Sequence, residues 1–390
     1  MAAETWTRMP LGKFATLQRG HDLPDERRRP GTVPILGSFG ITGWHDEAKA
    51  RGPGVTVGRS GASFGVVSYS SIDYWPLNTA LYVINFHGND ERFAYYFLKA
   101  FDFKSYNSGS AQPSLNRNFV HPISVDVPPL PEQRAIAHIL GTLDDKVELN
   151  QRMNETLEAM AQALFKSWFV DFDPVRDKAQ CRDPNMPRHF ADLFPVSFDR
   201  TDLGNVPTGW SVTNLGEVLV LEYGKALKAE KREAGIYPVF GSNGQVGWHA
   251  EKLADGPGIV VGRKGNPGTV TWVPTDFFAI DTTFYVVPKL KGRCWCFLYY
   301  ALRYQDLASL GADSAVPGLN RNIAYMSKQL VPPLAVLDAF ECLMRPLFER
   351  RYRGDEQSRT LETLRDTLLP KLISGALRIR DAERIIGRQA

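Results

Sequence analysis

The chain contains an internal duplication that extends over most of its length, and this feature limits its possible folds more than any other. Residues 34–59 align without a gap to residues 238–263, at an offset of 204 positions (238 minus 34). Both segments contain Gly-Trp-His and Gly-Pro-Gly at the same places. The same offset relates residues 115–118 to 319–322, which both have the sequence Leu-Asn-Arg-Asn. A chain with two such copies is expected to build one structural unit twice.

Each copy ends in a long amphipathic segment. In residues 131–172 apolar side chains recur at alternating spacings of four and three, which is typical of a helix with one apolar seam. At 1.5 Å per residue, about 40 residues give a helix of roughly 60 Å. Because the second copy repeats the stripe, we predict that the two helices pair antiparallel as a coiled coil. The predicted inter-helix seam consists of Ile136, Leu140, Leu143, Leu157, Met160, Leu164, Phe340, Met344, Leu347, Leu361, Leu364 and Leu368.

Proline and asparagine residues interrupt this stripe. Pro346 lies inside the second helical segment, and an interior proline removes a backbone hydrogen bond, so we expect a bend or a break before Leu347. Pro370 lies near the end of the same segment. Asn150 and Asn154 are polar positions in the first helix, and a buried polar residue in a seam usually sets the register of the pair.

The predicted fold class is α+β, with two strand-rich domains in a pseudo-two-fold arrangement separated by two long antiparallel helices. Short β-branched and aromatic runs, such as residues 55–57 and 80–84, lie between Gly, Pro, Asn and Asp clusters in both copies. The predicted order is a first domain (1–130), a central long helix (131–172), a connector without helical periodicity (173–206), a second domain (207–333), a C-terminal long helix (334–378) and a tail (379–390).

Composition excludes several classes of protein. A hydrophobic content of 43% over 390 residues is enough for ordered cores, and a net charge of +3 requires any nucleic-acid surface to be a local patch. The four cysteines lack zinc-site spacing, so no metal site is predicted. The first residues contain no apolar signal core, and no run of 18 apolar residues could span a membrane. We expect a cytoplasmic protein that does not contact a membrane.

No catalytic motif is present. The sequence lacks a Walker loop, an HExxH pair, a GxSxG elbow, a dinucleotide-binding GxGxxG and the Asn-Pro-Pro-aromatic run of amino-methyltransferases. Asp171 and Asp173 could be imagined as metal ligands, but an acidic pair beside Pro174 is more typical of a helix end. We therefore predict no catalytic residue, no metal and no cofactor bound by this chain.

Two glycine-bounded loops are the best candidates for a binding surface. Arg59 and Arg263 each lie between glycines after a β run, and a guanidinium group binds phosphate or the edge of guanine. The alternative is an internal salt bridge with the glycines as turn residues. The loops at 37–43 and 241–247 share a frame but differ at their tips, which fits two surfaces for different DNA sequences, although surface drift would look the same.

Further cations cluster before the shared loops and could follow phosphates, although most charge runs are only solvated faces. The Trp-His pairs at 44–45 and 248–249 are interpreted as core packing with a hydrogen-bonded histidine. Structural hydrogen bonding is the first interpretation of the repeated Leu-Asn-Arg-Asn. The candidate DNA-binding residues are Arg19, His21, Ser38, Phe39, Arg59, Ser60, Lys225, Lys228, Ser242, Asn243, Arg263 and Lys264.

Four segments carry a family resemblance. Residues 130–134 (Leu-Pro-Glu-Gln-Arg), 143–146 (Leu-Asp-Asp-Lys), 163–172 with its Phe-Lys-Ser-Trp-Phe core, and 361–375 resemble the conserved regions of type I restriction-modification specificity subunits. The resemblance implies two target recognition domains, each binding one half of a bipartite double-stranded DNA site, held apart by a coiled coil. It also implies a subunit without catalytic activity.

The resemblance further implies partner proteins. The family recruits two methyltransferase subunits, which use S-adenosylmethionine to methylate adenine, and in the full complex two restriction subunits that use ATP and Mg²⁺. The family's base-contacting positions vary with the target, so the candidate DNA contacts rest on loop chemistry alone. Two alternatives stay open: an autonomous DNA-modifying enzyme, which would transfer a methyl group without a partner, and a non-DNA scaffold, whose binding would not depend on salt.

Overall fold

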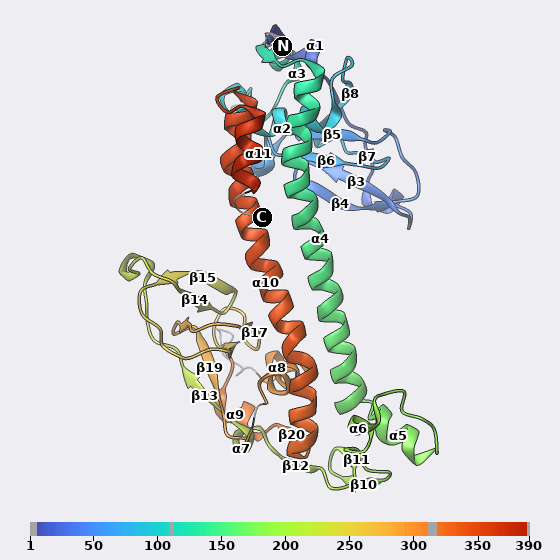
Figure 1. Cartoon of the computed structure of the whole chain (residues 1–390), viewed down its shortest axis with the longest axis vertical. Coiled ribbons are helices and arrows are strands. Elements are labelled where there is room, and N and C mark those ends of the chain that lie inside the picture. Colours follow the sequence, from blue (N-terminus) through green and yellow to red (C-terminus); the bar gives the residue numbers. More distant parts are fainter. Residues whose placement is uncertain (1–5, 109–112, 293, 311–317, 388–390) are drawn as a thin grey trace. The chain divides into compact units, whose positions relative to one another are not determined.

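The computed structural model describes residues 6–108, 113–292, 294–310 and 318–387, and it divides into two compact units. Unit 1 is Met1–Leu149 with Gln357–Ala390, and unit 2 is Asn150–Glu356. Each unit contains one strand-rich domain, here called the first and the second domain, and one half of each long helix, α4 (Leu130–Phe169) and α10 (Leu334–Ile373) (Figure 1). The predicted α+β class, with two strand-rich domains and two long helices that pack together, is confirmed.

The largest sheet has the same topology in both domains. Its order is β2-β8-β5-β6 in the first domain and β13-β19-β16-β17 in the second, and all neighbouring strands are antiparallel. The strands are β2 (Thr16–Arg19), β5 (Gly54–Gly58), β6 (Val67–Ser70), β8 (Ala80–Asn85), β13 (Leu219–Tyr223), β16 (Gly258–Gly262), β17 (Val270–Val273) and β19 (Thr283–Pro288).

A smaller sheet corrects the expectation of two loops at 37–43 and 241–247. These residues belong to hairpins, in which a two-residue turn joins antiparallel strands and a third short strand pairs parallel to the first. The glycines of these segments suggested loops, but they lie at the tight turn and at the β-bulge of each hairpin. The strands are β3 (Val33–Gly37), β4 (Gly40–His45), β7 (Trp75–Pro76), β14 (Tyr237–Gly241), β15 (Gly244–His249) and β18 (Phe278–Ala279).

Short helices and a two-stranded ribbon complete each domain. The helix α2 (Glu91–Ala100) begins at Asp90, whose carboxylate accepts a hydrogen bond from the Phe93 N–H, and α8 (Trp295–Tyr304) is its copy. Strands β1 and β9 pair in the first domain, as β12 and β20 do in the second. The remaining elements are β1 (Thr7–Pro10), α1 (Leu11–Phe14), α3 (Arg117–Val120), β9 (Ser124–Val127), β12 (Ser211–Asn214), α7 (Leu215–Val218), α9 (Arg321–Met326) and β20 (Lys328–Val331).

The segment 173–206 is more structured than the sequence suggested. It contains α5 (Asp173–Ala179), α6 (Arg188–Ala191) and a hairpin of β10 (Phe198–Thr201) and β11 (Gly204–Pro207). Helices this short cover two turns at most, so they leave no periodic stripe in the sequence. The tail contains α11 (Ile379–Gly387), and residues 388–390 lie outside the described part.

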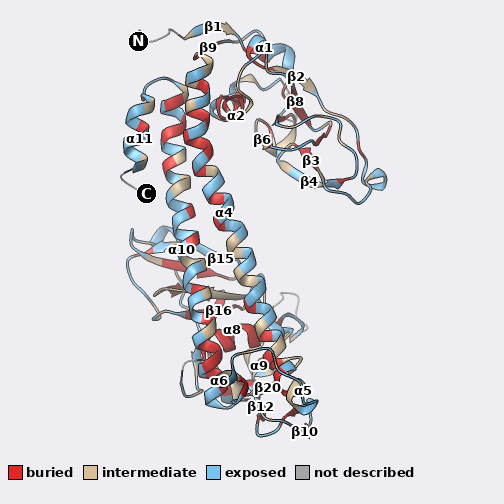
Figure 2. Ribbon diagram, turned by 45° about the vertical axis from the view of Figure 1, so that its right-hand side comes forward, coloured by how far each residue is buried: buried red, intermediate tan, exposed pale blue. Residues whose placement is uncertain are grey.

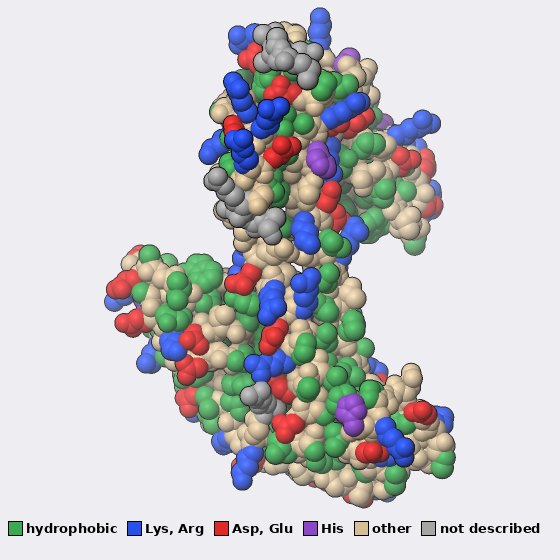
Figure 3. Space-filling model, viewed as in Figure 1, with side chains coloured by type: hydrophobic (Ala, Val, Ile, Leu, Met, Phe, Trp, Pro, Cys, Tyr) green, Lys and Arg blue, Asp and Glu red, His purple; other side chains and the backbone are tan. Residues whose placement is uncertain are grey.

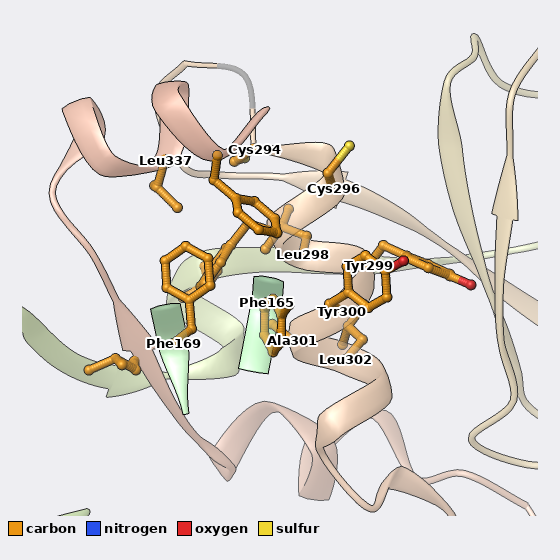
Figure 4. Packing of buried hydrophobic residues seen from close by; sticks show 14 of the residues in the cluster. Phe165, Phe169, Cys294, Cys296, Leu298, Tyr299, Tyr300, Ala301, Leu302 and Leu337 are labelled. Atoms are coloured by element: carbon orange, nitrogen blue, oxygen red, sulfur yellow. The ribbon is translucent and has the colours of Figure 1, made fainter. Parts of the chain in front are cut away.

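In unit 2 the helices pack through aromatic side chains. The Phe165 ring centroid lies 6.1 Å from that of Phe340, and the Trp168 centroid lies 5.8 Å from it. Figure 4 shows Phe165 and Phe169 of α4 beside Leu298 and its neighbours on α8. The Asn154 side chain donates to the Arg351 carbonyl oxygen at 3.2 Å. Residues later in α4 contact residues earlier in α10, so the two helices are antiparallel.

In unit 1 the other halves of the helices enclose the first domain's core. Ile136, Leu140 and Leu368 belong to one buried cluster with Phe93 and other residues of the first domain. Figure 2 shows buried stretches on α4 and α10 beside α2. An ion pair adds to the packing, because Arg365 Nη1 lies 2.6 Å from Asp144 Oδ1 and the Tyr96 hydroxyl donates to Asp144 Oδ2 at 2.6 Å.

The predicted seam residues differ in burial. Ile136, Leu140, Leu143, Phe340, Met344, Leu364 and Leu368 are buried, and Leu157, Leu164, Leu347 and Leu361 are half-buried. Met160 is 54% exposed, so its assignment to the seam is wrong. The buried positions at this level are Ala161 and Phe165, because the seam of a straight helix drifts with respect to a strict heptad.

The expected break in the second helix is absent, since α10 runs through Pro346 without interruption. Pro346 and Cys342, whose carbonyl oxygen would accept the missing backbone hydrogen bond, are both exposed. Water can therefore satisfy that carbonyl group, and the helix tolerates the proline. Of the two polar positions of α4, Asn150 is buried: it is 2% exposed and donates to the Gly354 carbonyl oxygen at 3.4 Å.

Glu158 forms a second polar contact in unit 2. Its carboxylate pairs with Arg303 of α8 and Arg351 of α10, and accepts a hydrogen bond from the Tyr300 hydroxyl at 3.2 Å. Burial alone would raise the pKa of Glu158, but the hydrogen bond from Gln162 and the two arginine charges outweigh it and lower the pKa below its usual value.

Replacement of Leu140 by alanine tests the packing of unit 1. Leu140 is fully buried, so Leu140→Ala is expected to lower the free energy of unfolding by about 2–5 kcal/mol. Leu149→Ala on the same helix is the matched control, because Leu149 is 51% exposed and its loss is expected to cost less than about 0.5 kcal/mol. Denaturant unfolding followed by circular dichroism measures the free energy of unfolding of both variants. Equal decreases in the two variants would contradict the packing of Leu140 in the core.

Replacement of Glu158 by glutamine tests the ion pair of unit 2. A carboxylate with a lowered native pKa stabilises the fold above its unfolded value of 4.5, and this contribution disappears as the pH falls through the native pKa. Glu158→Gln should therefore destabilise the protein by about 1–3 kcal/mol at pH 7, with a difference from wild type that narrows below about pH 4.5. Glu155→Gln, at an exposed position, is the control. If the difference in unfolding free energy between Glu158→Gln and wild type did not depend on pH, the role of the ion pair would be refuted.

Candidate nucleic-acid interface

A polar groove lies at one end of the main sheet of the first domain. It has a volume of about 770 Å³. Three arginines line it, Arg19 at the end of β2, Arg59 after β5 and Arg117 at the start of α3, together with His21 and Asn116. Positive charge and amide groups in a groove of this size suit a phosphate group or the edge of a base.

The backbone fixes the positions of these side chains. The Arg59 N–H donates to the Thr79 carbonyl oxygen at 2.9 Å, and the Leu115 N–H donates to the Arg59 carbonyl oxygen at 2.7 Å. The loop after β5 is thereby tied to the segment that leads into α3. The Asn116 side chain caps α3 by accepting a hydrogen bond from the Asn118 N–H at 3.0 Å. The arginine side chains remain at the surface, whereas the backbone that carries them is anchored.

In the second domain the equivalent residues form a stack. Tyr223 occupies the position of Arg19 at the strand end, and the guanidinium carbons of Arg263 and Arg321 lie 4.8 Å and 4.7 Å from its ring centroid. Arg263 also donates to the Asp281 carbonyl oxygen at 3.2 Å, and Arg321 donates to that of Leu221 at 3.3 Å. Tyr223 is 46% exposed, so this stack is at the surface. Each contact of this kind contributes about 0.5–1 kcal/mol at an exposed site.

The hairpin tips lie beside the arginine loops. In the first domain, a Cβ atom at Gly58 would lie 2.3 Å from the Ser38 carbonyl oxygen, so only glycine permits this approach. In the second domain, a Cβ atom at Gly265 would lie 3.1 Å from Ser242 Oγ, and the Asn266 side chain donates to Asn243 Oδ1 at 2.6 Å. The structure therefore brings each predicted tip to the predicted arginine loop of its own domain.

The other candidates are more scattered. Phe39 is 65% exposed at its tip, and Ser60 and Lys264 follow their arginines directly. Lys225 occupies the position of His21, whereas Lys228 is an exposed residue before a short 3₁₀ helix. The basic run at 27–29 is partly engaged within the domain, because Arg28 pairs with Asp25 and Arg29 with Asp46.

The prediction for the Trp-His pairs was right for the histidines and wrong for the tryptophans. His45 and His249 are buried, and each accepts a backbone hydrogen bond through Nδ1, at 3.0 Å and 3.2 Å. The tryptophans are not core residues, since Trp44 is 52% and Trp248 48% exposed. Successive residues of a strand point to opposite faces, so a buried histidine places its neighbour outside. Figure 3 shows hydrophobic side chains at the surface over β14 and β15.

Sequence reasoning missed Arg117 and Arg321 as candidates. Both belong to the repeated Leu-Asn-Arg-Asn, which was interpreted as structural. The interpretation holds for the first asparagine of each copy, because Asn116 and Asn320 cap α3 and α9. The signal that could have found the arginines is their place directly after a cap, where the side chain leaves the helix start toward solvent.

Among the described residues, no group of three or more His, Cys, Asp or Glu side chains could hold a metal ion. Within the same part of the chain, no helix is long and apolar enough to cross a membrane. The pKa values of Cys294 and Cys296 are raised, chiefly by burial, so neither thiol is an activated nucleophile.

Comparison with known proteins finds similarity to one family. Residues 3–159 match the family described as type I restriction modification DNA specificity domain. The MjaIX specificity subunit of Methanocaldococcus jannaschii is 24% identical over 352 residues, covering 81% of this chain and 76% of the relative. The HindI specificity subunit of Haemophilus influenzae is 26% identical over 332 residues, with 68% and 71% covered. Over most of its length this chain is similar to type I restriction-modification specificity subunits.

A solved structure supports the fold of this chain. The crystal structure of a type I S subunit from M. genitalium superposes with a TM-score of 0.68 at 20% identity, covering 95% of this chain and 96% of that one. The description of the matching family, a DNA specificity domain, indicates recognition of a DNA target. The arginine-bearing surface of each domain is accordingly a candidate DNA interface.

Proposed function

We propose that this chain is a specificity subunit that binds a bipartite site in double-stranded DNA, with each domain contacting one half of the site. The observation that carries the proposal is the duplicated surface. Arg59 with Arg117 in the first domain and Arg263 with Arg321 in the second lie at equivalent positions of the same fold. Two copies of one cationic surface on one chain suit two separate segments of a duplex.

The long helices act, in this proposal, as the spacer between the two half-sites. A 40-residue helix is about 60 Å long, and α4 and α10 are each continuous over 40 residues. The ion pairs Asp144–Arg365 and Glu158–Arg351 join the two helices. A stiff pair of helices favours a fixed separation over a flexible one.

The helices also serve, in this proposal, as the docking scaffold for two methyltransferase subunits, and for two restriction subunits where the system has them. S-adenosylmethionine would be bound by the methyltransferase, and ATP with Mg²⁺ by the restriction subunit. This chain would supply no cofactor site of its own. Its contribution to the reaction is to choose the DNA sequence and to position the partners on it.

The spacer length provides the test. Methylome sequencing of a host that expresses the chain with its methyltransferase partner should reveal two specified half-sites separated by an unspecified segment. Each added base pair rotates one half-site by about a tenth of a turn with respect to the other. We therefore expect the complex to lose at least about tenfold in affinity when two to four base pairs are inserted, measured by fluorescence anisotropy on duplexes.

Changing the sequence of the spacer at constant length is the matched control, and it should leave the affinity unchanged. Raising the salt concentration should weaken binding to every duplex, because phosphate contacts release counterions. Unchanged affinity for a lengthened spacer would contradict the fixed separation. Binding without any preference for duplex DNA would contradict the function itself.

A further inference from the structure

The duplication allows the two DNA-facing surfaces to be compared position by position within one chain. At an offset of 204, Arg59 corresponds to Arg263 and Arg117 to Arg321. The end of the first main strand differs between the copies. Gln18, Arg19 and His21 of the first domain stand where the second has Glu222, Tyr223 and Lys225. The surface therefore combines a shared pair of arginines with a variable strand end.

The backbone at the shared arginines is held in the same way in both domains. The Leu115 N–H donates to the Arg59 carbonyl oxygen at 2.7 Å, and the Leu319 N–H donates to the Arg263 carbonyl oxygen at 2.9 Å. The asparagine before the second arginine caps the following helix in both copies, with hydrogen bonds of 3.0 Å from the N–H two residues later. Identical anchoring predicts an identical partner.

The strand ends differ in chemistry and environment. Arg19 lines the open groove, and its guanidinium lies 4.0 Å from the Asp22 carboxylate with a 56% exposed side chain, so it is hardly restrained. Tyr223 instead lies under the guanidinium groups of Arg263 and Arg321. The first strand end offers donors to a base, whereas the second offers a carboxylate acceptor at Glu222 and a fixed aromatic ring.

We propose that the shared arginines, Arg59 with Arg117 and Arg263 with Arg321, bind the DNA backbone, and that the strand ends at 18–21 and 222–225 determine the base sequence of each half-site. The assignment rests on the proposed function. Every half-site has the same phosphates, so contacts to them can stay the same in both copies. The bases differ, so the residues that contact base edges must differ.

The chemistry of the side chains predicts which bases each strand end selects. Arginine binds the O6 and N7 atoms of guanine, and glutamine binds the N6 and N7 atoms of adenine. Arg19 and Gln18 therefore select purine edges for the half-site of the first domain. A glutamate accepts a hydrogen bond from the N4 amino group of cytosine, so Glu222 selects cytosine for the half-site of the second domain.

The test uses the complete chain in complex with its methyltransferase, and duplexes that carry every single base-pair change in both half-sites. The first variant, Arg117→Ala, should weaken binding about tenfold on all duplexes alike and reduce the slope of log affinity against log salt by about 0.9. The ranking of the duplexes should not change. Arg321→Ala should behave in the same way. Arg8→Ala is the matched control, because Arg8 is an exposed cation on β1, outside the groove.

The second variant exchanges the strand end. The triple change Gln18→Glu, Arg19→Tyr and His21→Lys introduces the residues of the second domain into the first. It should change the order of preference among duplexes altered in the first half-site and leave the order for the second half-site unchanged. Thermal unfolding of each variant verifies that the fold is retained, as expected for exposed or half-exposed positions.

Each possible result supports or overturns a different part of the proposal. If the exchange leaves the order of preference unchanged, or if Arg117→Ala alters it, the assignment of bases and backbone is overturned. Wild-type affinity in both arginine variants overturns the backbone contact. If the wild-type complex itself shows no preference for the bipartite duplex over a scrambled one, the proposed function fails, and that outcome is visible before any variant is measured.

Discussion

Burial of the apolar faces of α4 and α10 against the domain cores is the interaction on which the rest of the structure depends. Within a protein, an amphipathic helix gains most of its stability from tertiary packing of its apolar face. In unit 1, Leu140 and Leu368 belong to the same buried cluster as Phe93, and in unit 2 Phe165 and Phe340 belong to that of Phe297. Helices and domain therefore form one hydrophobic core in each unit. A domain cannot turn on its helices without opening that core.

Partly buried ion pairs restrict how each domain is oriented on the helices. Tyr96 and Tyr300 are equivalent residues, and each hydroxyl donates to a carboxylate of α4 that also pairs with an arginine of α10. The carboxylates, Asp144 and Glu158, are not equivalent positions of the repeat. A tyrosine, a carboxylate and an arginine therefore meet in both units, although the carboxylates come from positions that do not correspond. This recurrence indicates that the contact is needed in both units. A charge removed from water is costly unless it is paired, so these contacts disfavour other orientations of domain and helices.

Sequence reasoning was most successful where a pattern repeats and least successful where one residue departs from its pattern. The repeat at an offset of 204 predicted the fold class and the pairing of the helices. Met160 and Pro346 show why details were missed, because heptad drift exposes the first and solvent access makes the second tolerable. The groove joins β2, the loop after β5 and α3, which are distant in sequence. Only the folded chain shows that Arg117 belongs with Arg19, whereas the loop chemistry of Arg59 was visible in the sequence.

The end of the strand that reaches the groove, where the strand leaves the core, explains how the two surfaces could diverge without loss of the fold. Leu17 and Leu221 are equivalent, identical and fully buried, and they hold the strand on the core. Two residues further along, Arg19 and Tyr223 are exposed and unlike. Since exposed side chains contribute little to packing, a substitution at this strand end changes the surface chemistry at little cost in stability. A fold of this kind can acquire a new surface for DNA while the core that orients each domain on the helices stays unchanged.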